Sequence, residues 1–499
     1  MNDITAFFAF LRYCLGYKEN MSRVVAGMDW QMLYSFASKQ ALLGLYFEGI
    51  ERLGKEYPDE LRLNPIGREL LMTWMGKAQQ IRRQNRKVNL VASKLFSMLR
   101  EDGLRCCVLK GQGNALMYPN PYSRTPGDID VWIDVSRERI MEYAQKKFEL
   151  EDDIRLQHLE TSLDGVPVEL HFFPCSMNNP IYHARLQKWF RRNADLQCSH
   201  IVGLPDGAGD IAIPTTAFNV IYQLTHLYHH FFDEGIGMRQ IIDYFLVVNN
   251  FSKNVFLDND LSNHPVNFSN HPVNFSNHPV PLSKEGSTFS PSPSSMVFTP
   301  PSVPPFPGDR NLRSGDVTAP SRCSEPLRSK DGGPSKVSPD CAGWDRLDAI
   351  GASKPSPNCA GWDRLVIEGD NSAGSTAVVT SSASTALVVV QRELKYLGLW
   401  KFAGAVMYVL HEALGLSEEK MIAPMDAKRG KLLLAEILNG GNFGKHFTKY
   451  GGFTHQSMGK KYFLKIWRNM HFVRFFPAEA LSEPIFRTWH FFWRMKYKK

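Results

Sequence analysis

A chain of 499 residues is long enough for two or three domains of roughly 100–200 residues each. With 43% hydrophobic and 12% aromatic residues it can bury a substantial core, and its net charge of +8 permits a polyanionic partner without demanding one. Its eight cysteines form no CxxC pair and no regular framework, which excludes a disulfide-stabilised scaffold and favours reduced thiols in a cytoplasmic protein.

The hydrophobic runs carry no membrane signal. Residues 1–20 lack a basic stretch, and Arg12 interrupts their apolar run, which argues against a signal peptide. No uninterrupted apolar run of about 18 residues occurs, so we predict no transmembrane segment.

Residues 1–94 have the pattern of an N-terminal helical region. Apolar residues recur at helical spacing over 4–17 and 28–52, and 66–100 has the pattern of one long amphipathic helix. The polar face of that helix carries a basic cluster, Arg82, Arg83, Arg86 and Lys87. We interpret this cluster as a solvated helix face and keep a nucleic-acid surface as the alternative.

A catalytic core is predicted over 95–215. It begins with an apolar strand ending near Leu109, followed by a glycine-bearing turn and a short helix to about Met117. Free N–H groups at the start of a helix attract phosphate, and a lysine in the turn adds positive charge. The candidate phosphate-binding residues are Lys110, Gly111, Gln112 and Gly113.

A proline-rich loop leads from that helix to the segment GDIDVWI. The loop carries Arg124, a candidate for stabilising negative charge on phosphates, and Gly127, which allows close backbone approach. In a strand, Asp128 and Asp130 lie on one face. The other face then carries residues that can pack into a core, Ile129, Val131 and Ile133.

Two adjacent carboxylates repel each other unless a cation lies between them. Mg²⁺, bound by carboxylates together with substrate phosphates, meets that need. For a DxD pair taken alone, the alternative is a strand edge with both acids in water.

After the acids, the sequence predicts a helix over 136–148 with Ser136 as its N-cap. A hairpin should follow, because Asp164-Gly165 is a strong turn signal between two β-type runs. The second run, VPVELHFFP, therefore forms a strand that can lie beside the acidic segment.

That strand carries Glu169 between apolar residues, so a third carboxylate can join the first two. His171 lies two positions further on and shares its face. It can contact a phosphate or the acceptor, with a structural histidine as the alternative. His158, in the first strand of the hairpin, can also lie near the third acid.

The pattern LKG…YP…R..GDIDVWI followed by VELHF resembles the nucleotidyltransferases of the DNA polymerase beta superfamily, especially the bacterial nucleotidyltransferase family proteins. The resemblance implies that the catalytic residues Asp128, Asp130 and Glu169 hold two Mg²⁺ ions, with Mn²⁺ as the alternative. It also implies that the turn at Lys110 and Gly111 holds a triphosphate.

The activity implied by the resemblance is a nucleotidyltransferase reaction. A nucleoside monophosphate moves from an NTP, by default ATP, to a hydroxyl acceptor, and pyrophosphate is released. Two alternatives stay open: an inactive nucleotide-binding or regulatory module, and nucleotidyl addition to RNA ends. A nucleic-acid partner is not favoured.

Residues 216–251 form the first part of a second helical region, with Thr215 or Thr216 as N-cap and a break at Gly235–Gly237. Three histidines share a face, but without a further ligand we do not favour zinc: His226, His229 and His230. Arg239 and Asp243 have the spacing of a helix-surface ion pair. The resemblance extends through HL..HHFF.EGIGMRQ..D and makes Arg239 a candidate contact for a phosphate or base.

Residues 252–388 differ in composition. SNHPVNF repeats in tandem from 262, a second repeat covers 338–347 and 356–365, and the remainder is rich in proline and serine. We predict a low-complexity disordered insertion, because such a sequence buries too little apolar surface to offset its ordering entropy.

Helical patterning returns over 389–499, the second part of the helical region, which ends in a basic and aromatic tail. We expect the tail to pack onto the domain, with a membrane surface or single-stranded nucleic acid as alternatives. The predicted fold class is α+β: a small mixed-sheet core within a mostly helical chain that carries a long insertion.

Overall fold

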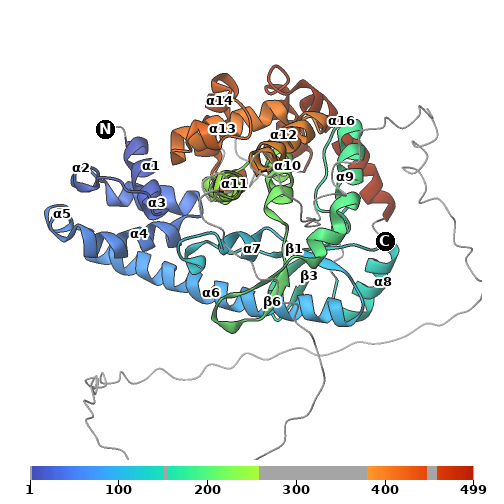
Figure 1. Cartoon of the computed structure of the whole chain (residues 1–499), viewed down its shortest axis with the longest axis horizontal. Helices are drawn as coiled ribbons and strands as arrows, with labels where there is room; N and C mark the ends of the chain where they lie inside the picture. Colours follow the sequence, from blue (N-terminus) through green and yellow to red (C-terminus); the bar gives the residue numbers. More distant parts are fainter. Residues whose placement is uncertain (1–2, 151–154, 258–378, 447–457, 498–499) are drawn as a thin grey trace, which may run out of the picture. The chain divides into compact units, whose positions relative to one another are not determined.

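The computed structural model describes residues 3–150, 155–257, 379–446 and 458–497 (Figure 1). These residues are mostly helical and include a small four-stranded mixed sheet, so the predicted fold class is confirmed. The tandem repeats predicted for 262–280 and for 338–365 lie outside the described residues.

The N-terminal region consists of six helices: α1 (Asp3–Cys14), α2 (Ser22–Ala26), α3 (Trp30–Lys39), α4 (Leu43–Glu56), α5 (Pro58–Leu63) and α6 (Arg68–Glu101). The first turn of α3 is capped by Asp29, whose side chain accepts a hydrogen bond from the Met32 N–H at 2.8 Å. Helix α6 spans 34 residues, as the long amphipathic pattern predicts.

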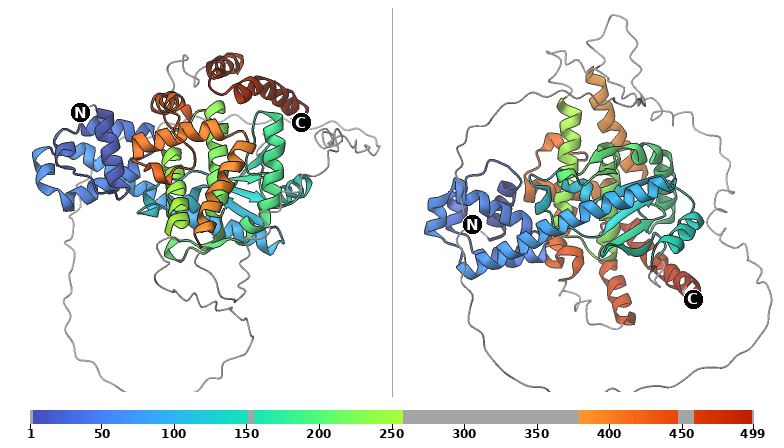
Figure 2. Two further views of the ribbon diagram at one scale, coloured as in Figure 1. Left: turned by 45° about the horizontal axis from the view of Figure 1, so that its top comes forward. Right: turned by 90° about the horizontal axis from the view of Figure 1, so that it is seen from below.

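Helix α6 contributes to two hydrophobic cores. Its first half packs among the N-terminal helices, where Trp74 is fully buried and donates its indole N–H to the Leu43 carbonyl at 2.9 Å. Its second half, from Val88 to Leu99, packs with the strands. Figure 2 (right) shows α6, in light blue, running across the sheet.

The basic cluster of α6 lies on a surface that already holds acids. Arg82 forms ion pairs with Glu48, at 2.8 Å, and with Glu51. Arg86 lies 3.5 Å from an oxygen of Asp206. Two of the four basic residues are thus paired with acids, which agrees with a solvated helix face and leaves less charge for a nucleic-acid backbone.

The main sheet has the order β1-β2-β4-β3, formed by β1 (Cys106–Leu109), β2 (Ile129–Ile133), β3 (His158–Leu163) and β4 (Val166–His171). Strands β2 and β4 are parallel, and the two outer pairs are antiparallel. The predicted turn joins β3 to β4, with positive φ at Asp164 (51°) and Gly165 (70°). Such a turn follows the right-handed twist of the two strands.

The two faces of β2 meet different cores, as its alternation predicts. Ile129, Val131 and Ile133 are buried in the core shared with the second half of α6. Trp132 points into the other core, where its ring stacks with that of Phe218 at a centroid distance of 6.3 Å. Asp130 therefore lies on the face that is turned toward the helical region.

Shorter elements complete the sheet region: α7 (Gly111–Ala115), α8 (Arg137–Lys147), α9 (Pro180–Ser199), β5 (Ile201–Gly203) and β6 (Asp210–Ala212). Ser136 caps α8 as predicted, accepting from the Arg139 N–H at 3.4 Å. Helix α9 and the small β5–β6 sheet were not predicted from the sequence pattern.

The second helical region contains α10 (Thr216–Asp233), α11 (Met238–Leu257), α12 (Val379–Tyr396), α13 (Trp400–Leu414), α14 (Ala427–Gly440), α15 (Met458–Met470) and α16 (Pro477–Tyr497). Helices α10 and α11 pack against α12, which the predicted insertion separates from them in the sequence. Helical structure reaches Leu257 and resumes at Val379, so the ends of the range 252–388 are helical rather than part of the insertion.

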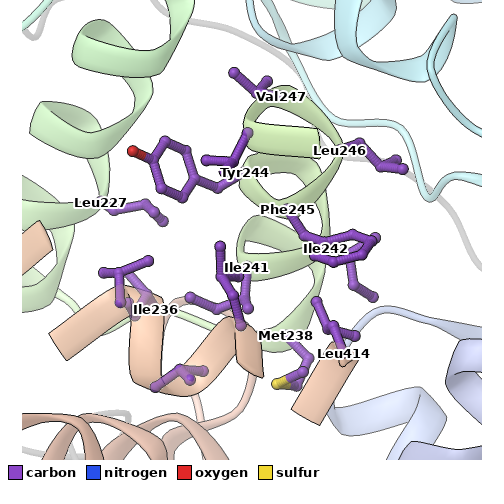
Figure 3. Packing of buried hydrophobic residues seen from close by; sticks show 14 of the residues in the cluster. Leu227, Ile236, Met238, Ile241, Ile242, Tyr244, Phe245, Leu246, Val247 and Leu414 are labelled. Carbon is purple, nitrogen blue, oxygen red and sulfur yellow. The ribbon is translucent and has the colours of Figure 1, made fainter. Parts of the chain in front are cut away.

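Helix α11 lies at the centre of the larger core. Figure 3 shows Ile241, Ile242 and Phe245 of α11 together with Leu227 of α10 and Leu414 of α13. Its side chains are buried on several sides, and most of them are apolar, while Arg239, Gln240 and Asp243 form a buried polar side facing the cavity. This burial explains why two segments separated by the insertion form one helical region.

The tail packs onto the end of α10, as expected. Asp233 lies 3.3 Å from Lys465 Nζ and 2.8 Å from Arg487 Nη2, and Arg468 Nη2 donates to the Phe231 carbonyl at 2.9 Å. None of the helices in the described part of the chain has an apolar stretch of the length that crossing a bilayer requires.

Close packing between α4 and the loop before β2 gives a stability prediction. A Cβ added at Gly44 would lie 2.3 Å from the Ser123 carbonyl oxygen, whereas one added at Gly54, in the same helix, meets no atom within 4 Å. We expect Gly44→Ala to lower the free energy of unfolding by about 1–3 kcal/mol, because the backbone must move apart. Gly54→Ala should raise it by about 0.5–1 kcal/mol. Chemical denaturation of both variants measures the difference, and equal effects would contradict the packing.

Candidate metal and nucleotide site

Three carboxylates meet where β2 and β4 run side by side. Asp128 immediately precedes β2, Asp130 lies within it, and the parallel register places Glu169 of β4 opposite Asp130. One oxygen from each of the three acids lies within 4.8 Å of the others. Asp128 is exposed, Glu169 is partly buried and Asp130 is 3% exposed. The structure therefore brings together the three acids that the sequence singled out.

Lys110 lies beside these acids. It follows β1 with a positive φ of 52°, a backbone conformation that L side chains rarely adopt. Its Nζ is 2.8 Å from Asp130 Oδ1 and donates to His226 Nε2 at 2.8 Å. Burial lowers the pKa of Lys110, but the three acids raise it further, so its pKa lies above the usual range. The side chain is thus a fixed positive charge at the centre of the site.

His171 joins two of the acids. Its Nε2 is 3.0 Å from Asp130 Oδ1 and 3.1 Å from Glu169 Oε2, and its Nδ1 lies 3.3 Å from Gln157 Nε2. Burial lowers the pKa of His171, but the bonds to the two carboxylates raise it to about 9. His171 therefore holds Asp130 and Glu169 in place, in the position that the sequence predicted.

His158 lies opposite His171 in the β3–β4 pair, with ring centroids 5.0 Å apart. Its Nδ1 is 3.4 Å from Glu169 Oε2. Burial and then the neighbouring His171 and Arg155 lower the pKa of His158 to about 2, so the ring is neutral.

A cavity adjoins the acids on the side of the second helical region. Its walls include Lys110, Gly111, Asn114, Arg124, Gly127, Asp128, Asp130, Gln223, His226, Leu227, Arg239, Gln240, Asp243 and Phe443. Four of the six predicted nucleotide-binding residues are among them. Gln112 instead donates to Asn89 Oδ1 of α6, and Gly113 packs against Ile213.

Arg124 lies in the wall of this cavity, but its charge is already paired within the protein. Its guanidinium forms a buried, bidentate pair with Asp243 of α11, at 2.8 and 2.7 Å, and Tyr118 donates to the same carboxylate at 2.7 Å. Burial raises the pKa of Asp243, but Arg124 lowers it more, so its pKa lies below the usual range. Arg124 thus holds the loop before β2 against α11, and its charge is already balanced.

The predicted surface pair between Arg239 and Asp243 is wrong, because α11 is a central helix and both side chains are buried. Arg239 instead donates from Nη1 to the Thr125 carbonyl at 3.1 Å, and its guanidinium lies 5.4 Å from the Phe443 ring centroid. Within the described parts of the chain, no carboxylate forms an ion pair with Arg239, and its Nε has no hydrogen-bond partner. A buried cation without an acid is suited to an anionic ligand.

Two of the three histidines of α10 contact neighbouring side chains, and among the described residues the three do not form a group with metal-binding spacing. His226 contacts Lys110, and His230 Nε2 lies 3.0 Å from His226 Nε2. In the part of the chain that the structure describes, the triads with metal-binding spacing are Asp128, Asp130 and Glu169, and also His158, Glu169 and His171.

Several cavity residues were not found from the sequence. Asn114 and Gln223 form a buried amide pair, with Gln223 Nε2 donating to Asn114 Oδ1 at 2.7 Å. Phe443 follows the predicted insertion in the sequence and has a positive φ of 53°. The stretch of α10 that carries the family resemblance could have indicated His226, whereas no local pattern indicates Phe443.

Comparison with curated proteins gave no match, and comparison with solved structures gave none either. The comparison with protein families gave one match, to a nucleotidyltransferase family, which agrees with the resemblance at the level of the family. Residues 26–262, which include all three acids and helices α10 and α11, match the model of a family described as "Uncharacterised nucleotidyltransferase".

Proposed function

We propose that this protein is a metal-dependent nucleotidyltransferase that moves a nucleoside monophosphate from an NTP to a hydroxyl acceptor. The observation that carries the proposal is the convergence of Asp128, Asp130 and Glu169, with one oxygen of each within 4.8 Å of the others. Three carboxylates so close together repel one another, and the two cationic side chains beside them, Lys110 and His171, offset only part of that charge.

The donor set fits hard divalent cations, because all three ligands are carboxylate oxygens. Asp128, Asp130 and Glu169 would hold two Mg²⁺ ions, with Mn²⁺ as the alternative. Bound there, the ions would neutralise phosphate charge and lower the pKa of an acceptor hydroxyl.

The residues of the chain supply binding and orientation. Lys110 and Arg239, which line the cavity, would contact the triphosphate, and Gly111 would leave the backbone accessible beside it. The acceptor hydroxyl attacks the α-phosphorus, its proton leaves to solvent, and the bond to the β-phosphate oxygen breaks to release pyrophosphate. His171 keeps Asp130 and Glu169 in register through both hydrogen bonds.

Arg239 offers a prediction that separates ligand binding from structure. We expect Arg239→Gln to weaken NTP binding by about tenfold or more, because a charge-assisted contact to phosphate is lost. Stability should stay equal or rise, because a buried cation without an acid partner is removed. Calorimetric titration with NTP and Mg²⁺, together with thermal unfolding, measures both. A large loss of stability with unchanged NTP affinity would assign Arg239 a structural role.

The test of the proposed activity is transfer of label. The full chain is incubated with Mg²⁺ and each of the four α-³²P-labelled NTPs in the presence of cell lysate, and label is followed into small molecules, RNA and protein. The expected result is incorporation together with pyrophosphate release. NTP binding without incorporation would instead favour an inactive nucleotide-binding module.

A further inference from the structure

We infer that a second cavity beside His158 binds the acceptor, and that the acceptor is an uncharged polyhydroxyl compound of the sugar class. The inference rests on the proposed nucleotidyl transfer and deepens it. The walls of this cavity include Arg155, Gln157, His158, Ser176, His229, Asp233, Glu483, Phe486, Arg487 and His490. We call it the acceptor cavity.

The acceptor cavity approaches the acid cluster through His158, the neighbour of Glu169. His158 lines the cavity, and its Nδ1 is 3.4 Å from Glu169 Oε2. The first cavity, which includes Lys110 and Arg239, meets the same cluster at Asp128 and Asp130. One cavity thus borders the carboxylates directly, and the other comes within one side chain, His158, of the same cluster, so that two substrates could meet near it.

Polar atoms without partners are concentrated in the wall of the acceptor cavity. Nε2 of His158, Nδ1 of His229, Oε2 of Glu483 and Nε2 of His490 are buried and have no hydrogen-bond partner among the described residues. His158 and Glu483 are only 9% and 1% exposed. Buried polar groups are normally hydrogen-bonded, so this wall is complementary to a ligand that supplies several donors and acceptors.

Helix α16 has polar residues toward this cavity and apolar residues toward the surface. Glu483, Phe486, Arg487 and His490 follow the spacing of one helix face, and all four line the cavity. On the outside, Ile485 is 73% exposed. Charged and polar side chains of α16 thus line the cavity while several of its apolar side chains are exposed, an arrangement that suits a polar ligand in the cavity.

The charges in the acceptor cavity are balanced. Arg155 pairs with Glu160 at 2.7 Å, and Arg487 pairs with both Asp233 and Glu483. Burial lowers the pKa of His490 to about 4, so it adds no charge at neutral pH. A polyanion such as an RNA end requires unpaired cations, whereas hydroxyl groups pair with neutral nitrogens, and Phe486 offers an apolar ring face to a sugar.

The test uses the full chain and compares His490→Leu with His490→Gln and with His471→Leu, an exposed histidine of the same C-terminal region outside the cavity. Saturation-transfer NMR with a panel of uncharged mono- and disaccharides measures binding directly. Labelled transfer to the same sugars and to oligoadenylate RNA measures the acceptor KM, and calorimetry measures NTP affinity.

We expect the wild type and His471→Leu to bind at least one sugar, His490→Leu to bind it at least about tenfold more weakly, and His490→Gln to recover part of the loss. NTP affinity should not change. Absence of sugar binding by the wild type, equal binding by His490→Leu, or transfer only to RNA or protein would overturn the inference. Sugar binding that depends on His490 without any transfer would support the cavity and contradict the nucleotidyl transfer itself.

Discussion

Asp130→Asn should lower nucleotidyl transfer by more than about 100-fold while the protein remains folded. The substitution keeps the volume of the side chain but removes the charge that a cation needs. Asp130 is 3% exposed and lies within hydrogen-bond distance of Lys110 and His171, so solvent cannot replace it as a ligand. Labelled transfer under saturating NTP and Mg²⁺ measures the loss, and Mg²⁺-dependent NTP binding by calorimetry should weaken in parallel.

Asp134→Asn is the matched control. Asp134 follows β2 by one residue and pairs with Arg105 at the surface, away from the carboxylate cluster. Its substitution should leave transfer within a factor of two or so of the wild type, because surface changes of this kind shift energies by less than about 0.5 kcal/mol. Equal activity of both variants and the wild type would refute the metal site.

Asp243→Asn should lower the free energy of unfolding by about 3–5 kcal/mol, because it leaves the buried guanidinium of Arg124 without its counter-charge. Arg124 and Asp243 are 5% and 5% exposed and connect the loop before β2 to the central helix α11. In the same variant Oδ1 can still accept from Tyr118, but an amide NH₂ group replaces the oxygen that accepts from Arg124 Nη2. Urea denaturation measures the change as a shift in midpoint.

Two comparisons isolate the ion pair. Asp59→Asn removes the acid of an exposed pair with Arg62, and should cost no more than about 0.5 kcal/mol. The double variant Arg124→Met/Asp243→Asn should be more stable than Asp243→Asn alone, because no unpaired charge remains buried. If the single variant is as stable as Asp59→Asn, the pair does not anchor the loop.

Local sequence patterns predicted much of the fold and the positions of the acidic residues of the site. The hairpin at Asp164-Gly165, the cap at Ser136 and the alternation of β2 all follow from short-range sequence rules. Alternation alone places Asp130 and His171 on definite faces of their strands. Register then aligns Asp130 with Glu169, a pairing that the sequence suggested but did not define.

Long-range partners were harder to predict. The spacing of Arg239 and Asp243 indicated a surface pair because helical periodicity does not reveal that α11 is central. Once α11 is buried, Asp243 takes its partner from the loop at Arg124, and Arg239 is left facing a cavity. Phe443 reaches the same cavity from beyond the insertion, and its position depends on how α14 ends rather than on any motif.

Local sequence identified the chemical groups: three carboxylates and a lysine at a glycine turn, an order that resembles nucleotidyltransferases. Which cations are balanced and which line a cavity depends on the folded structure, because burial and long-range pairing set the energy of a charge. Arg124 and Arg239 have the same side chain, yet the first is neutralised by Asp243 and the second has no acid partner among the described residues. The free energy of a buried charge depends on its neighbours in space, and those neighbours are assembled by packing of helices far apart in the chain.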